Sequence, residues 1–102
     1  MRKILAATLV MMMALMGMMA GSAAAELPVL RVGMECAYAP YNWTQAEPSE
    51  YAVPLAAGGY ADGYDVQVAR YLAEQLGMQL EIVKTEWDGL IPALTSGTGK
   101  ID

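Results

Sequence analysis

The sequence predicts an α/β fold with a parallel sheet, in the order strand, loop, helix, strand, helix, strand. Three observations indicate this fold. Two short apolar segments, residues 29–34 and 79–84, have the composition of strands. A segment with helical spacing lies between them, and a second one follows residues 79–84 before another strand-like start at residues 100–102. Strands that alternate with helices pair in parallel through right-handed crossovers.

The first strand, residues 29–34, leads into a loop that is rich in polar and aromatic groups. This loop breaks at Pro40 and carries the carboxylate of Glu35. Three aromatic residues share the loop: Tyr38, Tyr41 and Trp43. Loops at the carboxyl ends of parallel strands can converge on a ligand without disturbing the core. The loop is therefore the first candidate site.

Residues 44–63 are predicted to form a loop or a small hairpin. They contain Pro48, Pro54 and three glycines, and the pair Asp62–Gly63 is a typical turn sequence. We therefore expect the turn of any hairpin at Asp62–Gly63.

The first helix is predicted over residues 65–76. Ala69, Leu72, Ala73 and Leu76 follow the i, i+3, i+4, i+7 spacing of a helix that buries one stripe. Gly77 suits the C-terminal cap of this helix. Asp65, at its start, is expected to cap the helix or to tie down the preceding loop, with contact to a ligand as the alternative.

The segment QLEIVK, residues 79–84, predicts a second strand directly after the helix. A second helix follows, for which Asp88 is the expected cap, with Pro92 tolerated in the first turn and Gly97 at the end. Its inward-facing residues are expected to be Leu90, Ile91 and Leu94. Residues 100–102 then begin a third strand. Glu86 and Trp87 follow the second strand, so adjacent parallel strands would place them on one rim with the Glu35 loop.

Residues 1–25 have the organisation of an export signal. A basic start, an uncharged apolar segment over residues 4–20 and the small residues of positions 21–25 follow one another, with cleavage expected after Ala25. An uncleaved membrane anchor is the alternative, because 17 apolar residues are at the lower limit for spanning a bilayer. The predicted location is the periplasm or extracytoplasmic space.

The composition excludes several kinds of site and partner. The sequence has no His and one Cys, which excludes His-based catalysis and metal cages of His and Cys within this chain, and no cofactor is indicated. Cys36 cannot form an internal disulfide, lacks the small-residue setting of a lipoprotein cysteine, and is expected to be a buried or half-buried thiol. After cleavage the chain would contain four basic and eleven acidic residues, which gives a net charge of −7. Such a surface argues against nucleic acid and anionic membranes as partners.

Several segments together resemble the bacterial extracellular solute-binding proteins of the amino-acid type, which serve ABC importers. The resemblance is carried by LRVGMECAYAPYNW at residues 30–43, Gly63-Tyr64-Asp65, KTEWDGLIPAL at residues 84–94, Ser96-Gly97, and the strand start at residues 100–102. It implies a type II periplasmic-binding-protein-like fold of two α/β lobes that close on one free amino acid. Residues 26–102 would be the N-terminal part of the first lobe, and the chain would be truncated.

The resemblance also implies a ligand-binding site made of Glu35, Tyr38, Tyr41 and Trp87. An Arg that binds the ligand's α-carboxylate would lie beyond Asp102. The chemistry of the residues agrees, because an ammonium group taken out of water needs a carboxylate or the face of a ring. A ligand carboxylate would need an Arg or a helix N-terminus, and neither is evident in these loops. We therefore expect the half of the site that binds the ammonium group and the side chain, with Glu35 favouring a basic or polar amino acid.

Each of these residues has a structural alternative. Glu35 could bond to backbone N–H groups of its own loop, Tyr41 could pack within the lobe, and Trp87 could be a hydrophobic staple on the second helix. Trp43 is expected to cover the loop. Tyr60 and Tyr64 are expected to be packing residues.

Three classes of function are compatible with the sequence. The first is a monomeric, non-enzymatic binding protein that delivers an amino acid to a membrane permease. The second is a periplasmic enzyme on the same fold, such as a cyclohexadienyl dehydratase, for which Glu35 or Glu86 would have to act as general acid or base. The third is the ligand-binding domain of a sensor, which a downstream membrane helix and kinase region would reveal.

Overall fold

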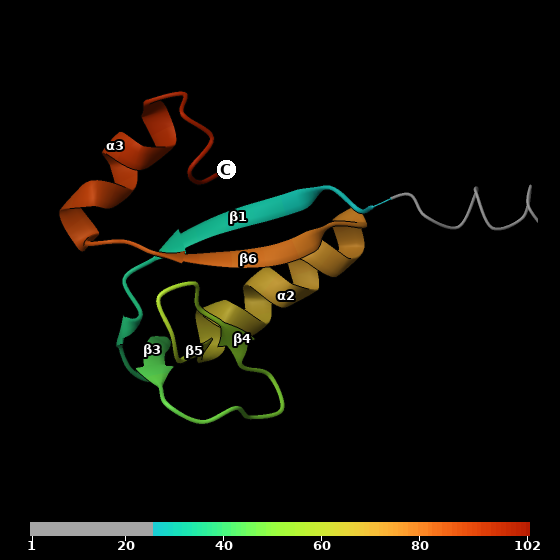
Figure 1. Ribbon diagram of the computed structural model, residues 1–102, viewed down its shortest axis with the longest axis vertical. Coiled ribbons are helices and arrows are strands. Elements are labelled where there is room, and N and C mark those ends of the chain that lie inside the picture. Colours follow the sequence, from blue (N-terminus) through green and yellow to red (C-terminus); the bar gives the residue numbers. More distant parts are fainter. Residues whose placement is uncertain (1–25) are drawn as a thin grey trace, which may run out of the picture.

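The computed structural model describes residues 26–102, which form a mixed α/β structure with two sheets (Figure 1). The predicted signal segment, residues 1–25, lies outside the described residues. The elements, in order, are β1 (Val29–Met34), β2 (Ala37–Tyr38), β3 (Asn42–Gln45), β4 (Val53–Pro54), β5 (Tyr60–Asp62), α2 (Tyr64–Leu76), β6 (Gln79–Lys84), the 3-10 turn η1 (Trp87–Gly89) and α3 (Leu90–Thr95).

The first sheet is the parallel pair that the sequence predicts. β1 and β6 run side by side with Val29 opposite Gln79 and Met34 opposite Lys84. The crossover between them is α2, and in Figure 1 α2 and α3 lie on opposite sides of this strand pair. Because the two strands end in register, the loops that follow them emerge at the same edge of the sheet.

Helix α2 confirms the predicted helix, with one difference in the face that it buries. Gly77 ends the helix at φ 66°, and its N–H donates to the carbonyls of Ala73 and Glu74, as expected for a glycine cap. The buried residues are Val66, Ala69 and Ala73. The expected stripe is therefore wrong at two positions within the described residues: Leu72 is 48% exposed and Leu76 62%.

The start of α2 is capped by the backbone of a distant loop. Its N-cap is Gly63, and no side chain makes a cap hydrogen bond, so Asp65 is not the cap. Instead, the N–H groups of Tyr64 and Asp65 donate to the carbonyls of Pro40 and Tyr41. Asp65 accepts a hydrogen bond from the Asn42 amide, which is the alternative role, tying down the preceding loop.

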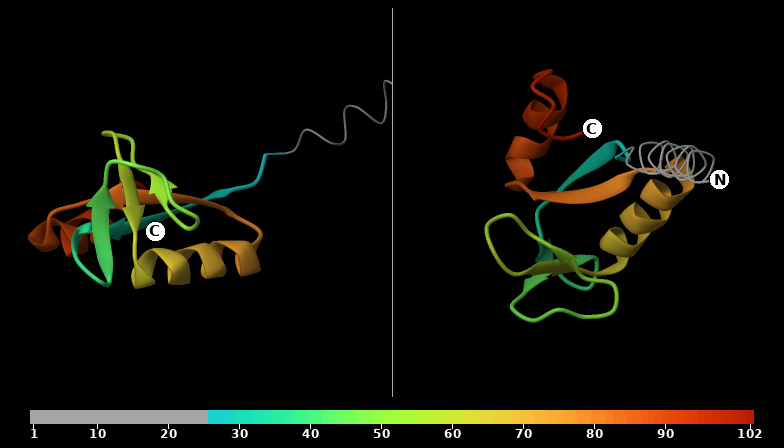
Figure 2. Two further views of the ribbon diagram at one scale, coloured as in Figure 1. Left: turned by 90° about the horizontal axis from the view of Figure 1, so that it is seen from below. Right: turned by 45° about the vertical axis from the view of Figure 1, so that its right-hand side comes forward.

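The second sheet is larger than the predicted loop or hairpin. Its antiparallel strands follow the order β2-β3-β5-β4, and β3 and β5 pack against α2 (Figures 1 and 2). The hairpin between β4 and β5 turns at residues 55–59, where the N–H of Leu55 donates to the carbonyl of Gly59. The turn expected at Asp62–Gly63 is wrong, because Gly63, at φ 123°, forms the junction between β5 and α2.

The second predicted helix is present, but it is shorter than expected and does not bury the expected face. It begins with η1, no side chain caps either η1 or α3, and Asp88 therefore does not act as the expected cap. Leu90 is half-buried, near Gly33. Ile91 and Leu94 are 68% and 48% exposed among the described residues, so their predicted inward orientation is wrong here.

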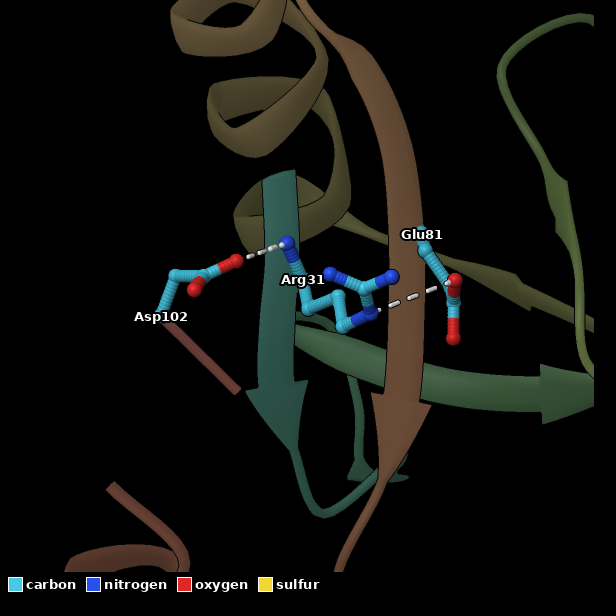
Figure 3. A network of polar contacts seen from close by, with 3 residues as sticks. All are labelled: Arg31, Glu81 and Asp102. Atoms are coloured by element: carbon cyan, nitrogen blue, oxygen red, sulfur yellow. Dashed lines mark hydrogen bonds and ion pairs between the residues drawn. The ribbon is translucent and has the colours of Figure 1, made fainter. Parts of the chain in front are cut away.

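Residues 100–102 are not assigned as a strand, but their backbone bonds to β1 at the place of a third strand. The N–H of Asp102 donates to the Arg31 carbonyl at 2.8 Å, and the Arg31 N–H donates to the Asp102 carboxylate at 2.9 Å (Figure 3). On the other side of β1, Arg31 pairs with Glu81 of β6 at 3.8 Å. The buried side chain of Ile101 anchors this segment.

None of the helices within residues 26–102 is both long enough and apolar enough to span a membrane.

Candidate functional site: a cavity beyond the ends of β1 and β6

A cavity of about 450 Å³ lies over the C-terminal half of β1, between residues 35–43, which we call the aromatic loop, the first nine residues of α2 and the turn that begins η1. This volume is within the roughly 300–1,000 Å³ typical of small-molecule sites. The polar and aromatic residues of its lining are Glu35, Tyr38, Asn42, Tyr64, Asp65 and Trp87. Three of the four predicted site residues therefore share one cavity: Glu35, Tyr38 and Trp87. Their contact with a ligand stays a prediction.

The register of the parallel pair places Glu35 and Trp87 together. Met34 and Lys84 lie opposite each other at the ends of the two strands, and the N–H of Thr85 continues the ladder to the Met34 carbonyl at 3.0 Å. Glu35 therefore leaves β1 at the level at which the chain after β6 turns into η1. This arrangement follows directly from two adjacent strands that end side by side.

Tyr41, the fourth predicted site residue, does not line this cavity. Its ring stacks on that of Tyr38, with ring centroids 5.4 Å apart and planes at 24°. Offset aromatic pairs at such distances are favourable beyond the area that they bury. Tyr41 therefore contacts the cavity wall through the ring of Tyr38, and a direct contact between Tyr41 and a ligand stays a prediction.

The charge of the cavity wall is negative. Glu35 is half-buried, and within residues 26–102 its carboxylate accepts no hydrogen bond, so the alternative in which it serves its own loop is not what the structure shows. Asp65 is also half-buried in the lining, which contains no Lys or Arg among the described residues. Such a wall suits a cationic group of a ligand, because a cation leaving water needs carboxylates or ring faces.

Cys36 follows Glu35 directly but faces the interior. Its residue is 2% exposed, which confirms the predicted buried thiol. Burial raises the pKa of the Cys36 thiol, and the positive charge of Lys84 opposes this by lowering it. The thiol is therefore protonated and enclosed at neutral pH, which makes it a packing group and not a nucleophile.

Two lining residues, Tyr64 and Asn42, were not expected from the sequence, and both depend on the contact between the loop and α2. Tyr64 was expected to pack, but it is 66% exposed and lines the cavity. Asn42 is buried and donates its amide to Asp65 at 2.9 Å. The only signal in the sequence is that Asn42 belongs to the aromatic loop and that Asp65 starts a predicted helix, which does not predict a contact between them.

Trp43 and Glu86 lie outside the cavity lining. Trp43 is half-buried and donates its Nε1–H to Gln45 at 2.8 Å, as expected for a residue that covers the loop. Glu86 is exposed and lies outside the cavity lining. In the part of the chain that the structure describes, no group of three or more Cys, Asp or Glu residues is arranged to hold a metal ion.

Comparison with known proteins identifies the family. The family model of the bacterial extracellular solute-binding proteins, family 3, matches residues 30–102. The chain is 32% identical over 85 residues to an octopine-binding periplasmic protein of Rhizobium meliloti, covering 83% of this chain and 25% of the relative. It is 37% identical over 71 residues to an L-arginine-binding protein of Pseudomonas aeruginosa, covering 70% and 23%.

A third relative is an enzyme. Over 66 residues the chain is 39% identical to a cyclohexadienyl dehydratase of Pseudomonas aeruginosa, covering 65% of this chain and 20% of the enzyme. The chain thus spans a quarter or less of the length of these relatives. No solved structure gives a significant match. The family match and the parallel α/β fold together show that this chain belongs to the bacterial extracellular solute-binding proteins of family 3 and forms part of a type II periplasmic-binding-protein-like domain.

Proposed function

We propose that this chain is the N-terminal part of the first lobe of an extracytoplasmic binding protein that takes up a free amino acid and delivers it to the membrane permease of an ABC importer. The main support is that Glu35, Tyr38 and Trp87, which follow the ends of two neighbouring strands, line one cavity of about 450 Å³. The family membership supports it, and two relatives are named for binding octopine and L-arginine.

The cavity suits the ammonium group and side chain of an amino acid better than its carboxylate. A carboxylate is bound by an Arg or by the free N–H groups of a helix N-terminus. The lining holds no Arg among the described residues, and the N–H groups of Tyr64 and Asp65 already bond to loop carbonyls. We therefore assign the carboxylate to a part of the protein outside residues 26–102.

The ligand is proposed to be a basic or polar amino acid. Glu35 and Asp65 give the cavity negative charge, and the exposed rings of Tyr38 and Trp87 offer faces to a cation. An acidic side chain would meet like charge in the same cavity, which is a strong barrier in a partly desolvated site.

Isothermal titration calorimetry of the full-length protein with each of the twenty amino acids tests this function. The expected result is one site per molecule with L-arginine, L-lysine or a neutral polar amino acid as the tightest ligand, and a matching rise in melting temperature. Tight binding of L-aspartate and L-glutamate alone would exclude the proposed ligand class. Binding of none of the twenty would exclude the function.

The enzyme alternative rests on the dehydratase relative. The carboxyl groups of this cavity that could transfer a proton are Glu35 and Asp65, whereas Glu86 lies outside it. Catalysis predicts turnover of a cyclohexadienyl substrate that falls sharply in a Glu35→Gln variant. A protein that retains an amino acid in a stoichiometric complex and turns over no such substrate is a binding protein.

Export is part of the proposal. Residues 1–25 are proposed to direct the protein out of the cytoplasm and to be removed after Ala25, leaving a monomer in the periplasm or extracytoplasmic space. Mass spectrometry of the exported protein is expected to show Glu26 as its first residue, and light scattering a single protomer. A first residue at Met1 would instead support the membrane anchor.

A further inference from the structure

Three hydrogen bonds fasten the aromatic loop to the first turn of α2. The Pro40 carbonyl accepts the Tyr64 N–H at 3.2 Å, and the Tyr41 carbonyl accepts the Asp65 N–H at 2.8 Å. The Asn42 amide donates to the Asp65 carboxylate at 2.9 Å. Two of these bonds satisfy N–H groups that every helix start leaves without an intrahelical partner. We call these three contacts the loop–helix clip.

The clip leaves no room between the two segments. Gly63, at φ 123°, precedes the helix, and a Cβ at this position would collide with the Tyr41 carbonyl. Only glycine adopts this backbone conformation readily and fits this space. The loop therefore cannot shift on the start of α2 without breaking the clip.

Tyr41 connects the loop–helix clip to Tyr38, which lines the cavity. The Tyr41 N–H donates to the Tyr38 carbonyl at 3.0 Å, and the two rings stack. The Tyr38 residue is 62% exposed, so few interior contacts hold its ring. The position of this cavity wall therefore depends on Tyr41, whose own backbone is held by the clip.

Packing alone does not explain why position 42 is an asparagine. It is 8% exposed, and its Oδ1 is buried without a partner among residues 26–102. An unsatisfied buried acceptor destabilises a fold by about 1–3 kcal/mol, whereas an apolar residue of similar size would avoid this cost. What the amide adds at this position is its donor bond to Asp65.

We propose that Asn42 and Asp65 are positioning residues, which hold Tyr38 in the orientation that binds the ligand and so set the ligand affinity through Tyr38. The effect on ligand affinity rests on the proposed function, whereas the orientation of the Tyr38 ring follows from the contacts alone.

The first experiment needs no ligand. In NMR spectra of the full-length protein, the Tyr38 ring protons are expected to show an upfield shift from the stacked Tyr41 ring, lost in Tyr41→Leu. Asn42→Ala is expected to reduce this shift, whereas Ser49→Ala, which removes a hydrogen bond to Asp62 in the same sheet, is expected to keep it. An unchanged Tyr38 shift in folded Asn42→Ala protein would overturn the proposal.

The second experiment is a double-mutant cycle with L-arginine as the titrant. Asn42→Ala is expected to weaken binding about tenfold in the wild-type background and less than about twofold in a Tyr38→Ala background, because residues that act through one another are not additive. Equal losses in both backgrounds would overturn the proposal. Where Asn42→Ala does not fold, Asp65→Ala removes the same bond at a position where alanine favours the helix. Because Asp65→Ala also removes a carboxylate from the cavity wall, this variant is judged by the Tyr38 ring shift and not by affinity.

A double variant in which the amide and the carboxylate exchange positions is the matched rescue. Asn42→Asp places two carboxylates together and is expected to weaken binding, whereas Asn42→Asp combined with Asp65→Asn restores one amide–carboxylate bond and is expected to regain most of the affinity. Ser49→Ala is expected to lower stability by about 1 kcal/mol without changing affinity. Failure of wild-type protein to bind any amino acid, with the Tyr38 shifts as expected, would refute the proposed function and leave the positioning role supported.

Discussion

Tyr41 and Asp65 are joined through their backbones, with the carbonyl oxygen of Tyr41 accepting the N–H of Asp65 at 2.8 Å. This bond makes a loop carbonyl the cap of a helix that begins more than twenty residues later in the chain. Because Tyr41 also stacks on Tyr38, the same bond connects the helix start to the wall of the cavity.

A methyl group at Gly63 is expected to break this connection. Gly63→Ala would force a side chain into the Tyr41 carbonyl at φ 123°, and we expect a loss of at least about 2 kcal/mol in the free energy of unfolding. Gly77→Ala, at φ 66° with nothing within 4 Å, is the matched control, and about 1 kcal/mol is expected there. Urea unfolding of the full-length protein measures both. Equal losses would show that backbone conformation and not the close approach decides.

Removal of the exposed indole is expected to affect binding and not folding. Trp87 is 70% exposed and lines the cavity, so Trp87→Ala removes a ring face from a cationic ligand. We expect L-arginine affinity to fall about two- to thirtyfold, in line with about 0.5–2 kcal/mol for a cation–π contact. Tyr51→Ala removes an aromatic ring that is 46% exposed and lies outside this cavity. Unchanged calorimetric affinity in Trp87→Ala would support the alternative in which Trp87 only staples η1.

The charge of Glu35 is expected to matter for affinity. Glu35→Gln keeps the shape of the side chain and removes its charge from a cavity without Lys or Arg among the described residues, so L-arginine binding should weaken at least tenfold. Glu81→Gln is the control, because it breaks only the exposed ion pair with Arg31 at 3.8 Å. Calorimetry of both variants with L-arginine and L-glutamine compares a cationic with a neutral side chain. A loss for both amino acids would place Glu35 at the ammonium group, and a loss for L-arginine alone would place it at the side chain.

Stability at alkaline pH is expected to depend on Cys36. Burial raises the pKa of this thiol in the folded protein, so the folded state keeps its proton at a pH where the unfolded chain has lost it. The contribution is fully present below the ordinary thiol pKa of about 8.5 and is lost as pH rises through the raised value. Urea unfolding at pH 7 and at pH values above about 9 should show a smaller pH-dependent loss in Cys36→Ala than in wild type.

Lys84 gives an independent check of the same thiol. Its charge lowers the pKa of Cys36, so Lys84→Met is expected to raise that pKa further and to slow alkylation by iodoacetamide in the folded protein. Lys100→Met removes the same charge from a residue that does not act on the thiol and should leave the rate unchanged. Faster alkylation in Lys84→Met would mean that the variant opens the structure around Cys36.

The strands and the long helix could be predicted from the sequence because their signals are local. The apolar segments of β1 and β6, the spacing along α2 and the glycine that ends it act within a few residues of one another. The short elements could not be predicted in detail. β2, β4 and η1 have two or three residues each, which is too short for a hydrophobic period to appear in the sequence.

The sequence by itself determined that Glu35 and Trp87 follow two parallel strands, because a crossover helix between two strands leaves their carboxyl ends at one edge. Only the tertiary structure decided which other residues lie beside Glu35 and Trp87 in the cavity wall. Tyr41 stacks on Tyr38 without lining the cavity, and Asn42, Tyr64 and Asp65 enter the cavity wall, because the loop carbonyls cap α2 in place of a side chain. That choice depends on the close approach at Gly63 between segments far apart in the sequence, for which local periodicity carries no signal.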